Sequence, residues 1–227
     1  MAYQLETPKP LSSIYLARGV DEVDEYRPWF TGDVFQVKNS SDMMIMLQHP
    51  CSLRIDGSVL EERLLMAQIT IGKNHRSDWN KHAFAEMPLP ELIEGDDTKY
   101  VVSFRHLELV ESETFGDGSS RIATLSSHGI NLLLQRWIFQ NSRVIVPTMT
   151  YEEQISGPYN EADLEAEWLS ELDGTQQGTS TTFHQWIRES PDGSDIRRQA
   201  MLEDPQQRAF VRREMIQEID RLIDSSG

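Results

Sequence analysis

The chain has 227 residues, enough for one large domain or for one domain with an appendage. Apolar residues make up 38% and charged residues 26%, which excludes a wholly disordered chain, and a single cysteine excludes an intramolecular disulfide. The formal net charge of −16 means that any binding of nucleic acid requires a local basic patch, because phosphate contacts supply most of the affinity. The sequence offers neither a signal peptide nor a long apolar segment, so we expect a cytoplasmic protein with no membrane partner.

Short apolar runs separated by turn residues dominate the first 150 residues and are typical of strands. Residues 1–26 show no strong period and predict a loose arm or a short helix. In chain order, strands are then expected at 34–37, 43–47, 63–71 and 122–126, one or two strands at 99–112, and an edge strand or an extended crossover at 84–92. Both faces of 43–47 should be buried because the run is continuously apolar, whereas two prolines in 84–92 favour an edge strand.

A helix should follow the last of these strands. Ser126 or Ser127 can cap it, and apolar residues recur at steps of three and four from Ile130 to Ile138, which places its end near residue 139. Together these elements predict a mainly β fold with helices, of the α+β class. The expected architecture is a small barrel or curled sheet with a helix packed on it.

The composition changes near residue 150. Eight acidic residues and no Lys or Arg lie from Glu152 to Asp173. This segment is either a solvated linker or an amphipathic helix, because Leu164, Trp168 and Leu172 recur every four residues. In the second case these three residues can bind a partner or cover a basic groove of the same chain.

A polar connector and a last helix follow the acidic segment. Residues 174–182 are small and turn-rich, and Pro205 is a plausible first residue of a helix that carries Phe210, Met215 and Ile219 on one stripe. These three residues are further candidates for partner contacts. The predicted organisation is an N-terminal arm at 1–26, a barrel domain at 27–150, an acidic segment with connector at 151–182, and a helical tail at 183–227.

The sequence His49-Pro50-Cys51 directly follows the apolar run 43–47. His49 and Cys51 point to the same side of an extended chain and could form a base and nucleophile pair. Alternatively, Pro50 ends the strand and Cys51, the only cysteine, fills the core. We expect the second arrangement, with a buried and chemically quiet thiol.

Other short motifs indicate neither a metal site nor a phosphate-binding loop. The six histidines form no metal-binding pattern, and no second cysteine exists, so neither a metal nor a cofactor is predicted. The sequence GDGSS at 116–120 has no lysine and too few glycines for a phosphate loop, and it predicts a hairpin turn.

The segment 72–84 combines positive charge with an aromatic residue. It contains Lys73, Arg76, Trp79 and Lys81. Such a loop can hold a phosphate chain with its cations and stack a base on its aromatic ring, or it can be a solvated connection between strands.

The order of these motifs resembles the MazF/PemK family of toxin ribonucleases over about residues 29–140. The motifs that match are Gly32-Asp33-Val34, Ala67-Gln68-Ile69-Thr70, the strand Phe104 to Val110, and Leu125-Ser126 before the helix. The resemblance implies an SH3-like barrel with a C-terminal helix, metal-independent cleavage of single-stranded RNA, and neutralisation of the toxin by an acidic segment. A homodimer is a further expectation.

One position departs from the family pattern. The family's catalytic pair is an arginine just before the second strand and a threonine at the end of the third. Thr70 matches the threonine, but Asp42 occupies the place before the second strand, and no Arg or Lys lies between Lys38 and Arg54. RNA cleavage needs a positive group for the developing phosphorane charge, so Arg54 is the candidate to replace the absent arginine, with Lys38 as the alternative.

These observations lead to two candidate functions of different classes. The first is a toxin-like or defence-associated protein that interacts with RNA through Lys73, Arg76, Trp79 and Lys81, and cleaves it if Thr70 and Arg54 cooperate. The second is a non-catalytic interaction subunit that reuses the barrel and binds a protein through the acidic segment or the last helix. A third alternative is an acidic mimic of nucleic acid.

Overall fold

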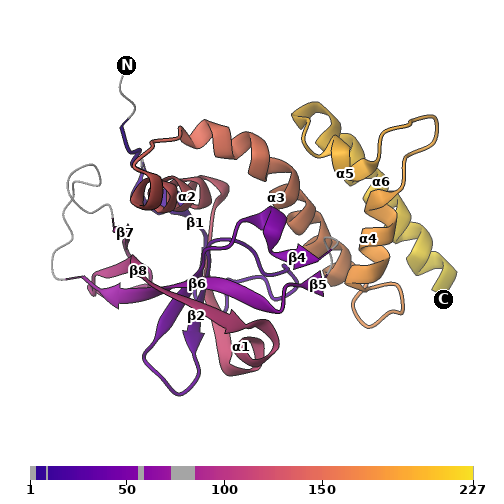
Figure 1. Ribbon diagram of the computed structural model, residues 1–227. Coiled ribbons are helices and arrows are strands. Elements are labelled where there is room, and N and C mark those ends of the chain that lie inside the picture. The colour runs from indigo at the N-terminus through magenta and orange to yellow at the C-terminus, as the bar shows by residue number, and fades with distance from the viewer. Residues whose placement is uncertain (1–3, 9, 56–58, 73–84, 227) are drawn as a thin grey trace. The chain divides into compact units, whose positions relative to one another are not determined.

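The computed structural model describes the chain except residues 1–3, 9, 56–58, 73–84 and 227 (Figure 1). The chain forms two compact units. Unit 1 consists of Met1–Val23, Phe30–Leu53 and Leu60–Glu152, and unit 2 consists of Asp24–Trp29, Arg54–Val59 and Glu153–Gly227. Each unit is described by itself below.

Unit 1 is built on a curled, seven-stranded antiparallel sheet with the strand order β1-β9-β2-β3-β6-β8-β7 (Figure 1). The strands are β1 (Tyr15–Arg18), β2 (Asp33–Val37), β3 (Met43–Met46), β6 (Arg63–Ile71), β7 (Glu86–Leu89), β8 (Tyr100–Glu111) and β9 (Ser119–Leu125). Outside this sheet, a separate ladder joins β4 (Arg54–Ile55), which belongs to unit 2, and β5 (Val59–Leu60). The short 3-10 turn η1 (Leu11–Ile14) precedes β1, and η2 (Pro50–Ser52) precedes β4. The α+β class and the curled, barrel-like sheet are thereby confirmed.

The most apolar predicted strands lie in the middle of this sheet. All residues of β3 are buried, as expected for a continuous apolar run between β2 and β6. β6 covers the predicted range 63–71, and the proline-containing β7 is an edge strand, also as predicted. Of the one or two strands predicted over 99–112, the structure has one, β8, whose pairing with β6 shifts register between Ser103 and Leu107.

Two local predictions were wrong. Tyr15–Arg18, expected in a loose arm, is the edge strand β1 and pairs with β9, a partner more than 100 residues away. GDGSS does not form a hairpin turn: it spans the end of helix α1 (Ser112–Gly118) and the start of β9. The helix forms there because Phe115 packs edge-on against Phe35, with 5.3 Å between the ring centroids, so an aromatic anchor outweighs the local turn preference.

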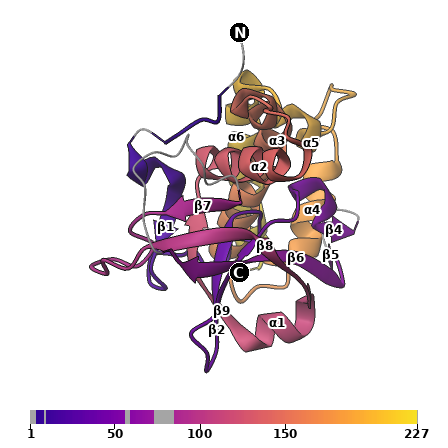
Figure 2. The ribbon, with the colours of Figure 1, turned by 60° about the vertical axis from the view of Figure 1, so that its left-hand side comes forward.

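Helix α2 (Ser127–Ser142) packs on the sheet and contacts η1, β7 and β9 (Figure 2). Its N-cap is Ser126, one of the two predicted caps, whose hydroxyl accepts a hydrogen bond from Gly129 N at 3.1 Å and donates one to Ser13 O at 2.6 Å. A Cβ at Gly129 would collide with the carbonyl oxygen of Ile14. The absence of a side chain at this position therefore lets η1 lie directly against the helix.

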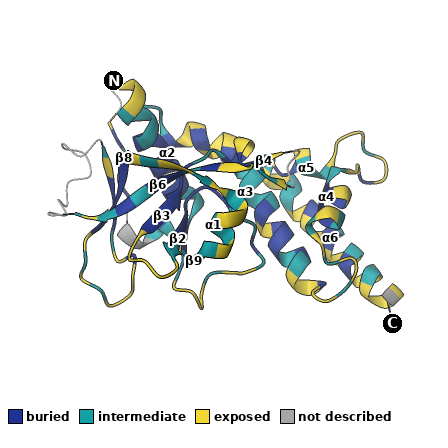
Figure 3. Cartoon of the chain, turned by 60° about the horizontal axis from the view of Figure 1, so that its bottom comes forward, coloured by how far each residue is buried: buried dark blue, intermediate teal, exposed yellow. Residues whose placement is uncertain are grey.

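Unit 2 is helical. Helix α3 (Thr148–Glu171) begins in unit 1 and continues into unit 2, where α4 (Ser180–Arg188), α5 (Arg198–Met201) and α6 (Pro205–Ser226) follow. Of the two alternatives for the acidic segment, the structure has the helix. Its apolar face joins those of α4, α5 and α6 in a core that includes Trp168, Phe183, Trp186 and Met215, and Figure 3 shows buried and exposed faces alternating on these helices.

Within the described part of the chain, no helix is long and apolar enough to cross a membrane.

Candidate functional site

Thr70 lies near the C-terminal end of β6, one residue beyond the part of the strand that pairs with β3. The pairing of β6 with β3 ends at Ile69, so Thr70 pairs only with Val101 of β8, and its side chain is half-buried. Two residues later, Gly72 N still donates to Lys99 O at 2.7 Å. The backbone at Thr70 is thus held on one side by β8, and the chain then enters the basic segment 73–84.

The polar side chains beside Thr70 belong to the β6–β8 pair. Gln68 lies on the same side of β6 as Thr70, opposite Ser103 of β8, and its amide donates a hydrogen bond to the Glu108 carboxylate. These side chains contribute hydroxyl, amide and carboxylate groups. A described cation also lies on this ladder: Lys99, two residues before Val101, is exposed.

The cation predicted to act with Thr70 is engaged in unit 2. Arg54 Nη2 donates to the carbonyl oxygen of Trp29 at 2.6 Å. Lys38, the alternative, donates to Asp117 O at 2.7 Å. In the described ranges, no lysine or arginine hydrogen-bonds to the Thr70 hydroxyl, and the cooperation of Thr70 with Arg54 stays a prediction.

The four residues predicted to bind RNA, Lys73, Arg76, Trp79 and Lys81, fall in 73–84 and lie outside the described residues. Their role also stays a prediction.

Several other cations of unit 1 hold the fold together. Arg121 Nη1 forms a buried ion pair with Asp33 Oδ2 at 3.0 Å, and Asp33 Oδ2 also accepts from Phe30 N. The Arg136 guanidinium is buried beneath the N-terminal segment and donates to Glu6 O at 3.3 Å, and burial lowers its pKa to about 10. Arg18 pairs with Glu91 at 3.4 Å. These arginines are committed to structural contacts.

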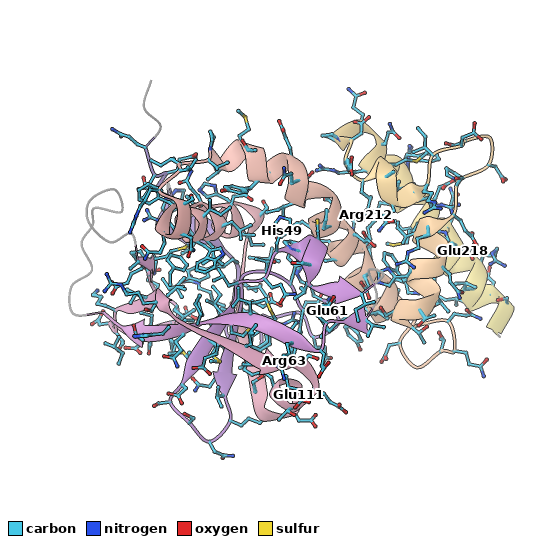
Figure 4. The ribbon with its side chains drawn as sticks, viewed as in Figure 1. His49, Glu61, Arg63, Glu111, Arg212 and Glu218 are labelled. Carbon is cyan, nitrogen blue, oxygen red and sulfur yellow. The ribbon has the colours of Figure 1, made fainter. Side chains whose placement is uncertain are left out.

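The expectation of a buried Cys51 was wrong, since its side chain is exposed. Pro50 is the first residue of η2, and His49, labelled in Figure 4, is the N-cap whose Nδ1 accepts a hydrogen bond from Cys51 N at 3.3 Å. Burial lowers the pKa of His49, which favours the neutral imidazole that this acceptor role requires. Leu53, at the end of the turn, fills the core instead of the thiol.

A buried charged cluster in unit 2 was missed by the sequence reasoning. Glu161 and Glu165 lie one turn apart on α3, and His184 of α4, only 3% exposed, lies between them. Its Nδ1 is 3.4 Å from Glu161 Oε1 and its Nε2 is 3.3 Å from Glu165 Oε2. Both contacts are close enough for strong charge attraction, although neither has the alignment of a good hydrogen bond.

Polar side chains complete this cluster. Gln199 Nε2 donates to both oxygens of Glu161, at 3.1 and 3.0 Å, and the Ser180 hydroxyl donates to Glu165. Burial alone lowers the pKa of His184, but the two carboxylates outweigh it and raise the pKa from 6.5 to about 9. At neutral pH His184 is a histidinium that joins α3 to α4 electrostatically. The spacing of Glu161 and Glu165 was the only signal in the sequence.

The predicted partner-binding residues have another role in the structure. Leu164, Trp168, Leu172, Met215 and Ile219 are all buried in the core of unit 2. Their apolar character is explained by this core, so they do not form an exposed partner surface. Phe210, at 37% exposure, is the member of the set that solvent reaches.

In the parts of the chain outside the gaps given above, no group of three or more His, Cys, Asp or Glu side chains is arranged to hold a metal ion.

Comparison of the chain with protein-family models and with curated proteins found no match.

Proposed function

We propose that the protein is a toxin-like, nucleic-acid-interacting barrel protein that binds single-stranded RNA at the end of β6. The observation that supports this most directly is the position of Thr70. This half-buried residue is the second-last of β6, shortly before the segment that contains Lys73, Arg76 and Lys81. Arg121 and Arg136 are engaged in the fold, and this segment adds three cations directly after Thr70.

The chemistry of the segment suits a single strand. Lysine and arginine neutralise phosphates, and the indole of Trp79 offers a face on which any base can stack, which gives affinity with little sequence preference. Cleavage requires in addition a base for the 2′-hydroxyl and a cation for the developing charge, the roles that the resemblance gives to Thr70 and Arg54.

A non-catalytic interaction subunit is the second candidate. It is favoured by the contact of Arg54, which donates to the Trp29 carbonyl in unit 2. An acidic mimic of nucleic acid is a third and weaker candidate, supported by unit 2, whose sequence holds 19 acidic and nine Lys or Arg residues.

Binding is tested with the full chain and a fluorescent single-stranded oligoribonucleotide at fixed salt. The triple variant Lys73→Ala, Arg76→Ala, Lys81→Ala should lose at least about tenfold in affinity, since each phosphate contact contributes separately. Arg213→Ala removes an exposed arginine of α6 and is the matched control, with affinity unchanged. If the unaltered chain does not bind RNA, the proposal fails and the interaction subunit is favoured.

Cleavage is tested separately with Thr70→Val, which removes the hydroxyl and keeps the branched shape suited to a strand. A ribonuclease should lose cleavage and keep binding in this variant. Binding without cleavage in the unaltered chain identifies a non-catalytic RNA-interacting protein.

A further inference from the structure

Residues 4–8 of the N-terminal segment are held against α2 and the first turn of α3, all within unit 1. They form neither helix nor strand, yet the side chains of Leu5 and Pro8 are buried. Figure 1 shows this stretch, in indigo, beside α2. Apolar side chains buried by a stretch without secondary structure are typical of a bound peptide.

The main chain of Glu6 is bound by side chains of α2. Its N–H donates to Gln135 Oε1 at 2.8 Å, and its carbonyl oxygen accepts from Arg136 Nη2 at 3.3 Å. Gln135 and Arg136 are themselves almost fully buried, at 0 and 1% exposure. Every peptide carries these two main-chain groups, so this pair of contacts recognises a polypeptide whatever its side chains.

The side chain of Glu6 is recognised as well, at the start of α3. Its Oε1 accepts from Thr148 N at 2.9 Å and from Gln135 Nε2 at 3.2 Å, and its Oε2 accepts from Thr148 Oγ1 at 2.6 Å. Burial raises the pKa of Glu6, but these hydrogen bonds and the charge of His128 outweigh it and lower the pKa. The carboxylate thus supplies the cap that the N-terminus of α3 requires.

We call Gln135, Arg136 and Thr148 the clasp. If residues 4–8 left, these buried or half-buried groups would lose hydrogen-bond partners, which is costly unless another ligand replaces them. The ligand that fits has a leucine, an acidic residue directly after it, and a proline two residues further on. Leu5 and Pro8 are three residues apart, the repeat of a polyproline II helix, and a proline keeps the residue before it extended.

We propose that the clasp is a docking site for a partner protein that carries a segment of the pattern leucine, acidic residue, any residue, proline. Residues 4–8 are its intramolecular occupant, and the partner segment replaces them and takes over their contacts. A polypeptide is the occupant because the clasp binds a main-chain N–H and C=O together with a carboxylate, and Leu5 is buried beside them. The proposal is independent of RNA binding.

The intramolecular occupant competes with any partner. Residues 4–8 are tethered through η1, which contacts α2, so their effective concentration at the clasp is on the order of millimolar. A free peptide that makes only the same contacts should therefore bind poorly to the unaltered chain. It should bind once the tethered copy is weakened.

The test is a fluorescence-anisotropy titration with the labelled, capped peptide QLETP, the sequence of residues 4–8. Three full-length chains are compared: the unaltered chain, Glu6→Gln, and the double variant Leu5→Asp, Glu6→Lys. Affinity for the peptide should increase in that order, by at least about tenfold from the first chain to the last. The peptide should also raise the melting temperature of the double variant and leave that of the unaltered chain unchanged. If the double variant does not fold, Glu6→Gln decides, and binding no tighter than to the unaltered chain overturns the proposal.

Two controls test the recognition itself. The peptide QLQTP, which lacks the carboxylate, should bind the double variant at least about tenfold more weakly than QLETP, and so should QLETP when Gln135→Ala is added to that variant. Asn141→Ala, which changes an exposed amide of the same helix, should leave the affinity unchanged.

Three results would contradict the proposal. The first is the absence of binding to a folded double variant at about 1 mM peptide, and the second is equal binding of QLETP and QLQTP. The third is a dimer of the unaltered chain that the double variant cannot form, because it would assign the clasp to residues 4–8 of a second copy instead of a partner protein.

Discussion

Cys51 is exposed at the turn after β3, and its backbone amide, not its thiol, contacts His49. We predict that the native thiol reacts with a thiol reagent at the rate of an exposed cysteine, and that His49→Ala does not slow the reaction. Cys51→Ser should change the free energy of unfolding by no more than about 0.5 kcal/mol, as at other surface positions. A marked loss of labelling rate in His49→Ala would instead indicate a thiol activated by the imidazole.

His184 makes the stability of unit 2 depend on pH. Its pKa rises from 6.5 to about 9 on folding, so the folded protein holds the proton more tightly than the unfolded chain. The stabilisation is fully present below pH 6.5 and is lost as the pH rises towards 9. We predict a decrease in the free energy of unfolding, on the order of 3 kcal/mol, measured by urea denaturation at pH 6.5 and pH 9.

A matched pair of variants isolates this effect. His184→Gln keeps a polar side chain between Glu161 and Glu165 but cannot carry the charge, so its stability should vary little between pH 6.5 and 9. His106→Gln, at an exposed position of β8, should keep the pH dependence of the unaltered chain. If His184→Gln shows the same decrease as the unaltered chain, the buried cluster is not its source.

At the scale of elements, the docking of η1 on α2 depends on Gly129. Alanine in place of glycine within a helix ordinarily stabilises it by up to about 1 kcal/mol. At Gly129 we predict the opposite sign, a loss of at least about 2 kcal/mol in thermal or urea denaturation, because the added methyl group meets the Ile14 carbonyl. Gly118→Ala, in α1 with open space around it, is the control and should not destabilise. Equal effects of the two changes would contradict the close approach.

Elements set by their own residues could be predicted from the sequence, and elements set by distant partners could not. β3 and β6 carry their apolar patterns within their own residues, and Ser126 caps α2 through a bond three residues away. β1 becomes a strand only because β9 lies beside it, and α1 forms where Phe115 packs against Phe35. Neither contact leaves a local signal.

The same distinction holds for the candidate sites. Thr70 could be placed at the end of a strand because β6 is a local pattern. The His184 cluster joins residues about 20 positions apart on two helices, and its partners are visible only in the fold. Leu164, Trp168 and Leu172 were correctly placed on one face of a helix, but the apolar pattern could not distinguish a face that binds a partner from one that completes a core.

At the scale of the whole molecule, both units carry net negative charge. Unit 1 holds 18 acidic and 12 Lys or Arg residues, and unit 2 holds 19 and nine. This background repels RNA at long range, and salt weakens the repulsion as well as the phosphate contacts. A single affinity cannot separate the two effects, whereas a comparison of two chains over a range of salt can.

The most direct measurement of the proposed function is therefore the salt dependence of single-stranded RNA affinity, for the unaltered chain and for the variant Lys73→Ala, Arg76→Ala, Lys81→Ala. Each lost phosphate contact on a single strand should reduce the slope of log affinity against log salt concentration by about 0.7, so we predict a slope shallower by about 2. Equal slopes for the two chains, or no binding by the unaltered chain at low salt, would contradict an RNA site at the end of β6.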